Sequence, residues 1–244
     1  TCDTYETHHR GQARGRALGR QPAAEMVGKK YDSKPCDTYD DYRELCARND
    51  LDVVIVATPD HWHAVQALEG LRNGKDIYCE KPVTHFFAEG QVLYREVAKR
   101  GAIFQTGSQQ RSASVFRNAV ELVRNGLIGK VKEVQVGLPK GPNKIKGDPT
   151  EEDRSGRKDY QFWTGPAPML PYVHARHHQM WRVHLAYGGG QLMDWIGHHN
   201  DIAHWGLGED QGGPVLVEAK KFSWIPVPVY QAPEHYEVHC EYAG

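Results

Sequence analysis

Two short motifs carry side chains that could act together on a substrate hydroxyl. The first is Glu80-Lys81-Pro82, which follows a strand-like run at 76–79, and the second pairs Asp194 with His198. Residues four apart share one face of a helix, so the Asp194 carboxylate can fix the tautomer of the His198 imidazole and favour its protonated form. Lys81 can steady a developing alkoxide, and His198 can take a hydroxyl proton while hydride leaves the adjacent carbon. The motifs therefore predict proton-coupled hydride transfer, with Lys81, Asp194 and His198 as catalytic residues.

Composition sets the classes of protein to which this chain can belong. It has 244 residues with a net charge of -1, which gives no reason to expect a nucleic-acid partner or an acidic-membrane partner. Its longest clean apolar run, at 53–57, is far too short to cross a bilayer. Five scattered cysteines without a C-x-x-C spacing predict reduced thiols. We expect a cytoplasmic protein, with export through a lost N-terminal leader as the alternative.

The elements that must position these side chains alternate in type over the first half of the chain. Apolar runs at 51–57, 76–79 and 102–106 predict strands, and helical spacing predicts helices at 38–48, 61–73 and 83–100. This rhythm predicts an α/β fold with a partial Rossmann-type, doubly wound parallel sheet. Ligands of such sheets bind at the carboxyl ends of the strands, where Lys81 lies.

A different pattern follows Gly107. A strongly amphipathic helix is predicted at 112–124, a strand at 131–138, a long loop at 139–158, a helix at 191–205, and strands at 215–219 and 236–242. This half predicts an α+β domain with an open, largely antiparallel or mixed sheet. We place the domains at 1–107 and 108–244.

Both ends of the chain are expected to be incomplete. Asp3 resembles the acid at the tip of a strand that binds the adenosine ribose in dinucleotide-binding domains. Gly11, Gly15 and Gly19 recur every four residues, which favours a helix over the G-x-G-x-x-G turn. We expect the first βα unit with its glycine-rich turn, roughly 30 residues, to be missing before Thr1, and further sheet to follow 236–244.

Several motifs together resemble one known family. They are Val54-Ile55-Val56-Ala57-Thr58-Pro59-Asp60-His61-Trp62-His63, Glu80-Lys81-Pro82, Gly107-Ser108-Gln109-Gln110-Arg111, Phe162-Trp163-x-Gly165-Pro166, and the run from Gly188-Gly189-Gly190 through Asp194 and His198 to Asp201. In this order they resemble the glucose-fructose oxidoreductase/inositol dehydrogenase (Gfo/Idh/MocA) family, and most of all its inositol 2-dehydrogenase-like branch. The resemblance implies a Rossmann domain that holds NAD or NADP, a second domain that binds a sugar or polyol, and a homo-oligomer (dimer or tetramer) for the full-length protein.

The resemblance also implies site residues. For the cofactor they are Asp3, Ala57, Thr58, Pro59, His63, Glu80, Lys81 and Gln109, and for the substrate they are Arg111, Trp163, Arg176, His177 and His199. Thr58-Pro59 can also be a plain β-α turn, His63 a helix-surface residue, and any one aromatic a core residue. The histidines of the second half raise the alternative of a zinc site. Their spacing is not that of ligands and no cysteine joins them, so we predict no metal.

The predicted function is that of an NAD(P)-dependent oxidoreductase, a dehydrogenase acting on a CH–OH group of a sugar, cyclitol or sugar derivative. Asp3 favours NAD, because a carboxylate repels the 2′-phosphate of NADP. Two alternatives stay open: an NAD-retaining glycoside hydrolase that acts by transient oxidation, and a non-catalytic sugar-binding fragment. The same side chains would serve the hydrolase, so cofactor recycling with a released aglycone separates it from net NADH formation.

Overall fold

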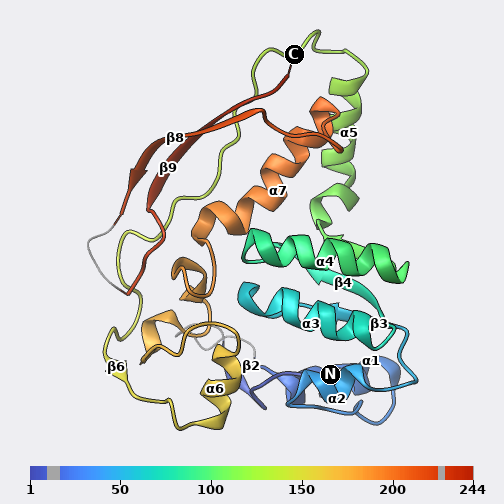
Figure 1. The fold of residues 1–244 in the computed structure, drawn as a ribbon, viewed down its shortest axis with the longest axis vertical. Coiled ribbons are helices and arrows are strands. Elements are labelled where there is room, and N and C mark those ends of the chain that lie inside the picture. The colour runs from blue at the N-terminus through green and yellow to red at the C-terminus, as the bar shows by residue number, and fades with distance from the viewer. Residues whose placement is uncertain (10–16, 225–228, 244) are drawn as a thin grey trace.

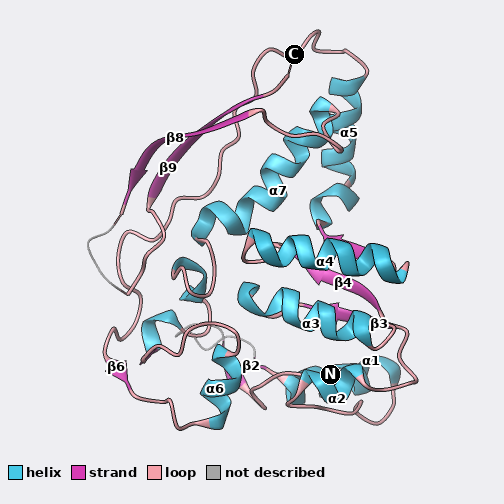
Figure 2. Ribbon diagram, in the orientation of Figure 1, coloured by secondary structure: helices cyan, strands magenta, loops and turns pink. Residues whose placement is uncertain are grey.

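A parallel sheet organises the first half of the chain. The computed structural model describes residues 1–9, 17–224 and 229–243. Strands β3 (Val53–Val56), β4 (Asp76–Glu80) and β5 (Phe104–Gly107) pair in parallel in the order β3-β4-β5, as Figures 1 and 2 show. β3 lies at one edge, with β4 as its strand neighbour among the described residues. The parallel sheet confirms the predicted α/β class.

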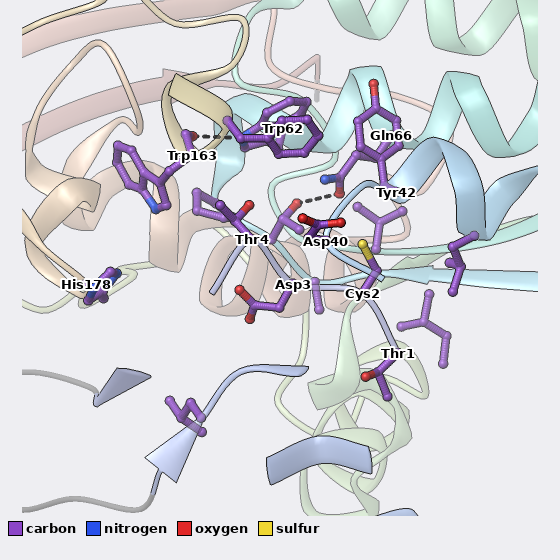
Figure 3. A pocket seen from close by; sticks show the side chains of 18 of the residues that line it. Thr1, Cys2, Asp3, Thr4, Asp40, Tyr42, Trp62, Gln66, Trp163 and His178 are labelled. Carbon is purple, nitrogen blue, oxygen red and sulfur yellow. Dashed lines mark hydrogen bonds between the residues drawn. The ribbon is translucent and has the colours of Figure 1, made fainter. Parts of the chain in front are cut away.

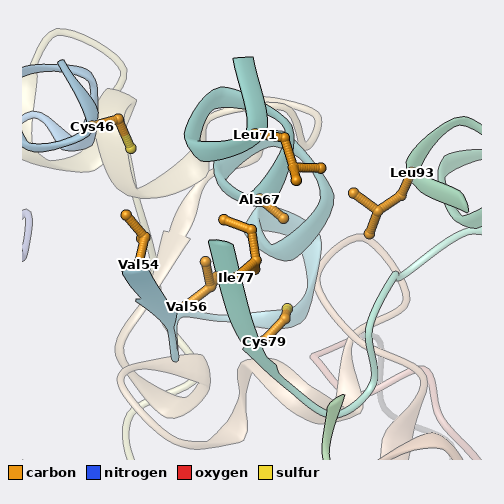
Figure 4. Close-up of a cluster of buried hydrophobic side chains, with 8 residues drawn as sticks. All are labelled: Cys46, Val54, Val56, Ala67, Leu71, Ile77, Cys79 and Leu93. Carbon is orange, nitrogen blue, oxygen red and sulfur yellow. The ribbon is translucent and has the colours of Figure 1, made fainter. Parts of the chain in front are cut away.

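Helices α3 (Asp60–Arg72) and α4 (Phe87–Arg100) pack on one face of this sheet. Alternate residues of β3 point to opposite faces, so Val54 and Val56 are buried while Val53 and Ile55 are exposed. Figure 4 shows the resulting core, which is made of Cys46, Val54, Val56, Ala67, Leu71, Ile77, Cys79 and Leu93. A Cβ atom at Gly70 would lie 2.6 Å from the Ile77 Cδ1 atom, so glycine there lets α3 approach β4 closely.

The chain begins beside the sheet. Short strands β1 (His8–His9) and β2 (Ala17–Leu18) pair antiparallel, and α1 (Arg20–Tyr31) and α2 (Tyr42–Cys46) follow. The helix predicted at 38–48 is shorter than expected, because Tyr39 bridges in parallel to Cys2 and the Asp41 side chain caps the helix by accepting from the Arg43 N–H. The helix expected around Gly11 and Gly15 lies outside the described residues.

Two other sequence predictions also differ from the structure. The helix expected from Val83 begins at Phe87, where the Glu89 side chain accepts the Phe86 N–H at 2.9 Å and sets the first turn. Residues 131–138 form no strand, because strands β8 (Leu216–Ser223) and β9 (His235–Glu241) pair with each other and none of the described strands pairs with this segment.

The second half combines helices with antiparallel strands. Its first elements are the 3₁₀ turn η1 (Gln109–Ser112), α5 (Ser114–Arg124), β6 (Glu151–Glu152), α6 (Lys158–Thr164) and β7 (Tyr172–Val173). Turns η2 (His174–Arg176) and η3 (Met180–Val183) lead to α7 (Gly190–Leu207), which packs on α5 (Figure 1). The antiparallel pairs β6–β7 and β8–β9 agree with the predicted sheet type. Within the described ranges, no helix has the length and apolarity that a membrane span requires.

Candidate functional site

The two motifs singled out in the sequence meet in space. Lys81, just beyond the end of β4, places its Nζ atom 2.6 Å from Oδ1 of Asp194 on α7. The same ammonium also donates to the backbone carbonyl of Asp194. The two side chains are only 13% and 19% exposed, so this ion pair between the two halves of the chain is partly buried. Gly197 borders the lysine stem, since a Cβ atom there would lie 3.5 Å from the Lys81 Cβ atom.

Neighbouring residues hold the turn that carries Lys81, whose peptide bond to Pro82 is cis. The Glu80 carboxylate lies across β5, where a Cβ atom at Gly107 would come within 2.9 Å of it. His63 lies beneath the turn, with Nδ1 2.5 Å from the Pro82 carbonyl oxygen and Nε2 2.9 Å from that of Thr58. The His63 ring is 1% exposed, so in this structure it contacts the protein backbone in place of the predicted cofactor.

His198 lies one helical turn beyond Asp194 and is buried. Its Nδ1 atom has no hydrogen-bond partner within the described residues. Burial, together with the nearby Lys81 charge, lowers the pKa of His198, while Asp194 acts in the opposite direction. The charge of Asp194 therefore favours the protonated imidazole, as expected, but burial and the Lys81 charge outweigh it. The expected fixing of the His198 tautomer by Asp194 is not seen, because the Asp194 carboxylate binds Lys81 and the Nδ1 atom of His198 has no partner in the described residues. A neutral imidazole with an unpartnered nitrogen is suited to accept a proton.

Two charged residues outside the predicted catalytic set complete the cluster. Arg182 places Nε 3.4 Å from Asp194 Oδ1, and its guanidinium stacks 4.3 Å from the centre of the Trp181 ring. Asp60, on the first turn of α3, is 4% exposed. Burial raises the pKa of Asp60 to about 7, although the charge of Arg182 opposes this shift. The sequence held a signal for Asp60, because it directly follows Thr58-Pro59 at the end of a strand.

A pocket of about 620 Å³ lies between the edge strand β3 and the first residues of the chain (Figure 3). Asp3, Ala57, Thr58 and Pro59 line it, and so does Arg182, which joins it to the Lys81–Asp194 cluster. Trp62, Phe162 and Trp163 add aromatic walls. Its size is typical of small-molecule sites, and its place at the carboxyl end of a parallel strand suits a dinucleotide. These four residues therefore fit a nicotinamide cofactor.

Three other predicted site residues lie on the surface or bind other parts of the protein. Gln109 is exposed at the end of β5. Arg111 holds Asp201 on α7 in a bidentate pair with distances of 2.7 and 2.8 Å, and also binds Asp210 at 2.8 Å. His199 is 2.8 Å from the Gly137 carbonyl oxygen through Nδ1. Arg111 and His199 thus hold segments of the second half together in this structure.

The remaining predicted substrate residues belong to a buried aromatic cluster. Trp163 packs with Tyr160, Tyr172, Trp181 and Tyr187, and its carbonyl accepts from the Trp62 Nε1–H at 2.8 Å. Arg176 and His177 lie in the same region, 4% and 6% exposed, bound to the backbone carbonyls of Pro171 and Val173. Of this set, the structure brings Trp163 to the pocket wall, whereas Arg176 and His177 do not line it.

The histidine-rich segments do not converge as a metal site in the part of the chain that is described. Over residues 1–9, 17–224 and 229–243, no group of three or more His, Cys, Asp or Glu side chains is arranged to hold a metal ion.

Comparison with protein families agrees with this geometry. Residues 5–108 match a family model described as "Oxidoreductase family, NAD-binding Rossmann fold" of the Gfo/Idh/MocA group. Residues 116–224 match the companion model, described as "Oxidoreductase family, C-terminal alpha/beta domain". Together the two models span most of the chain, and the first confirms NAD as the predicted cofactor class.

Individual proteins are similar over shorter stretches. The 2,7-anhydro-N-acetylneuraminate hydratase of Mediterraneibacter gnavus is 32% identical over 96 residues, which are 39% of this chain and 26% of that protein. The scyllo-inositol 2-dehydrogenase (NAD(+)) of Bacillus subtilis is 30% identical over 117 residues, which are 48% and 32% of the two chains. The chain thus covers only about a quarter to a third of these relatives.

A solved structure shows the same fold over a longer stretch. The oxidoreductase domain protein from Kribbella flavida superposes with a TM-score of 0.59 at 24% identity, over 85% of this chain and 48% of that one. Both family models, the relatives and the shared fold agree: the chain belongs to the Gfo/Idh/MocA oxidoreductase family.

Proposed function

We propose that the full-length protein is an NAD-dependent dehydrogenase of a sugar, cyclitol or sugar derivative. The observation that carries this proposal is the meeting of Lys81 and Asp194 at 2.6 Å, beside a buried His198 nitrogen that has no partner within the described residues. The three groups come from the two family domains, and Arg182 links them to the pocket that fits the cofactor. The predicted boundary between residues 107 and 108 is part of this proposal.

Each residue has a chemical task in the proposed reaction. Bound NAD would supply the hydride acceptor. The neutral His198 imidazole accepts the proton of the substrate hydroxyl, and a third N–H of Lys81 donates to the same oxygen, since its other contacts are the two Asp194 oxygens. Asp194 keeps the ammonium in place. Because this stabilisation grows as negative charge develops on the oxygen, it lowers the barrier more than it strengthens substrate binding.

Two finer proposals concern the class of substrate and the choice between NAD and NADP. Similarity to the scyllo-inositol dehydrogenase of Bacillus subtilis supports the inositol 2-dehydrogenase-like branch and a cyclitol or sugar substrate. Asp3 lines the pocket and supports NAD over NADP, because its carboxylate would repel a 2′-phosphate. The expectation that a βα unit is missing before Thr1 stays a prediction.

The test is an assay of NADH formation by the full-length protein with a panel of cyclitols and sugars. Lys81→Ala and His198→Ala should each abolish hydride transfer while NAD binding, followed by tryptophan fluorescence, persists. Near-normal turnover of either variant would refute the assigned roles.

A second function is favoured by one comparison. The relative from Mediterraneibacter gnavus is named a hydratase, so similarity to this chain extends to enzymes named for reactions other than dehydrogenation. Among reactions other than net dehydrogenation, the alternative that the sequence analysis predicted is an NAD-retaining glycoside hydrolase. Release of an aglycone without net NADH would favour it. Failure of the full-length protein to bind either NAD or NADP would favour the non-catalytic sugar-binding alternative.

A further inference from the structure

His63 connects two turns that follow neighbouring strands. It lies on the first turn of α3, and its ring reaches below the ends of β3 and β4. Nδ1 is 2.5 Å from the carbonyl oxygen of Pro82, and Nε2 is 2.9 Å from that of Thr58. With 1% of its surface exposed, the residue has no route to solvent or to a ligand in this structure. It therefore acts on the site only through the backbone.

The backbone that it holds is the one that carries Lys81. Pro82 is the next residue, so fixing its carbonyl restricts the orientation of the peptide unit from which the lysine side chain leaves. Other contacts to this turn are weaker, since the Cys79 thiol lies 3.5 Å from the Glu80 carbonyl oxygen and 3.9 Å from that of Val83. The far end of the lysine is held by Asp194 from the other half of the molecule.

The two ring nitrogens do not contribute equally. Burial lowers the pKa of His63, while the two carbonyls oppose that shift, and the nearby charges of Glu80 and Lys81 act in opposite directions. A neutral imidazole has one N–H, so it donates to one of the two carbonyls. The contact from Nδ1 to Pro82 is the shorter, which makes Pro82 the better candidate for the acceptor.

We propose that His63 is a positioning residue, which places the Lys81 ammonium by donating from Nδ1 to the Pro82 carbonyl. The proposal deepens the function proposed above and rests on it for its catalytic consequence. The claim that His63 sets the position of Lys81 does not depend on activity, so it can be tested without measuring turnover. A displacement of a catalytic group by about 1 Å can cost roughly 100-fold in rate, so a lost anchor should have a large effect.

Two substitutions separate the two ring nitrogens. The amide nitrogen of asparagine occupies about the place of Nδ1, and that of glutamine about the place of Nε2. His63→Asn therefore keeps a donor for Pro82, whereas His63→Gln keeps a donor for Thr58. His63→Ala removes both. His85→Ala is the matched control, because His85 is also buried, at 7% exposed, its Nδ1 atom has no hydrogen-bond partner in the described residues, and its backbone contact is to Leu185.

The first readout is the reactivity of Lys81 towards acetic anhydride in the 244-residue chain, quantified by mass spectrometry. Lys75 is the internal reference, since it is buried and donates to the Arg48 carbonyl at the opposite end of β4. We expect acetylation of Lys81 relative to Lys75 to rise several-fold in His63→Ala and His63→Gln, and to stay near the unsubstituted value in His63→Asn and His85→Ala. Unchanged labelling in His63→Ala, or equal labelling in His63→Asn and His63→Gln, would overturn the proposal.

The second readout is turnover in the full-length protein. His63→Ala and His63→Gln should lower kcat by about 100-fold with little change in NAD affinity, and His63→Asn should restore most of kcat. A rise in KM with kcat intact would contradict a positioning role. If the unsubstituted protein does not turn over, the proposed function fails while the labelling experiment still decides the place of Lys81.

Discussion

The Lys81 ammonium and the Asp194 carboxylate, 113 residues apart in sequence, lie 2.6 Å from each other, and neither side chain is more than 19% exposed. Arg182 approaches the same carboxylate oxygen at 3.4 Å. One aspartate therefore serves two cations. Because Asp194 has two cationic partners, substituting it should have a larger effect than substituting either cation.

Asp194→Ala should destabilise the fold more than Lys81→Met does. The first leaves both Lys81 and Arg182 without their carboxylate, whereas the second leaves Asp194 paired with Arg182. Removing one partner of a fully buried pair costs about 3 kcal/mol or more, and this partly buried cluster should lose less than that. Urea unfolding of the two single variants and of the double variant should give a clear coupling energy. Equal losses from the two single variants would contradict the shared role of Asp194.

Asp60→Asn should change how stability depends on pH. Burial raises the pKa of Asp60 to about 7 from an ordinary value of 3.8. Between these values the folded state binds the proton and the unfolded state does not, so this group makes stability fall as pH rises from about 4 to 7. Asparagine cannot titrate, so the Asp60→Asn variant should not lose folding stability through this group as pH rises.

The stability of Asp60→Asn relative to the unsubstituted protein should therefore increase across this window and level off above pH 7. The size should be a few kcal/mol at most, since one pKa unit corresponds to about 1.4 kcal/mol. Thermal unfolding at pH 4.5, 6 and 8 checks the trend. A difference that does not vary with pH would show that Asp60 is ionised in the fold.

Gly165→Ala should be far more harmful than Gly101→Ala, although both glycines have positive φ. Gly165 has φ +50° and ψ -118°, and a Cβ atom there would lie 2.0 Å from the Trp62 ring. Gly101 has φ +61°, with no atom within 4 Å of such a Cβ. We expect about 1 kcal/mol of backbone strain at Gly101 and about 3 kcal/mol at Gly165. Similar losses at both sites would mean that Trp62 moves freely, and its fluorescence would report that movement.

Arg111→Ala tests whether this arginine binds substrate or holds the protein together. Its bidentate pair with Asp201 and its bond to Asp210 predict a loss of about 1 to 2 kcal/mol of stability, with NAD affinity unchanged. Asp201→Asn should cause part of the same loss. If KM for the sugar rises while stability is unaffected, the original prediction of substrate contact is favoured instead.

The sequence predicts best where one local pattern determines the outcome. Short apolar runs predicted the three parallel strands, and helical periodicity predicted α3, α5 and α7 within a few residues. The extended run at 131–138 failed because a strand needs a partner, which no local pattern supplies. The early start expected for α4 failed because the Glu89 side chain accepts the Phe86 N–H and sets the first turn of the helix there.

The candidate site follows the same rule. The family motifs identified Lys81, Asp194 and His198, but the pairing of Asp194 with Lys81 in place of His198 depends on a contact across 113 residues. The place of Arg182 and Asp60 in this cluster depends in the same way on η3 and α3 approaching α7, which no local pattern shows. His63 was assigned to the cofactor because the family resemblance implied it, whereas the fold buries it against the backbone.

The outer margin of strand β3 affects how this chain should behave in solution. Along that margin the backbone amides and carbonyls meet no further strand among the described residues, and Val53 and Ile55 expose apolar side chains on the adjoining face. Such a margin is a template on which a second polypeptide can add itself. The same margin lines the pocket that fits the cofactor, so a second polypeptide can add itself only where that pocket is empty. Concentrated samples of the 244-residue chain without NAD should therefore self-associate, and light scattering that increases with protein concentration would reveal it.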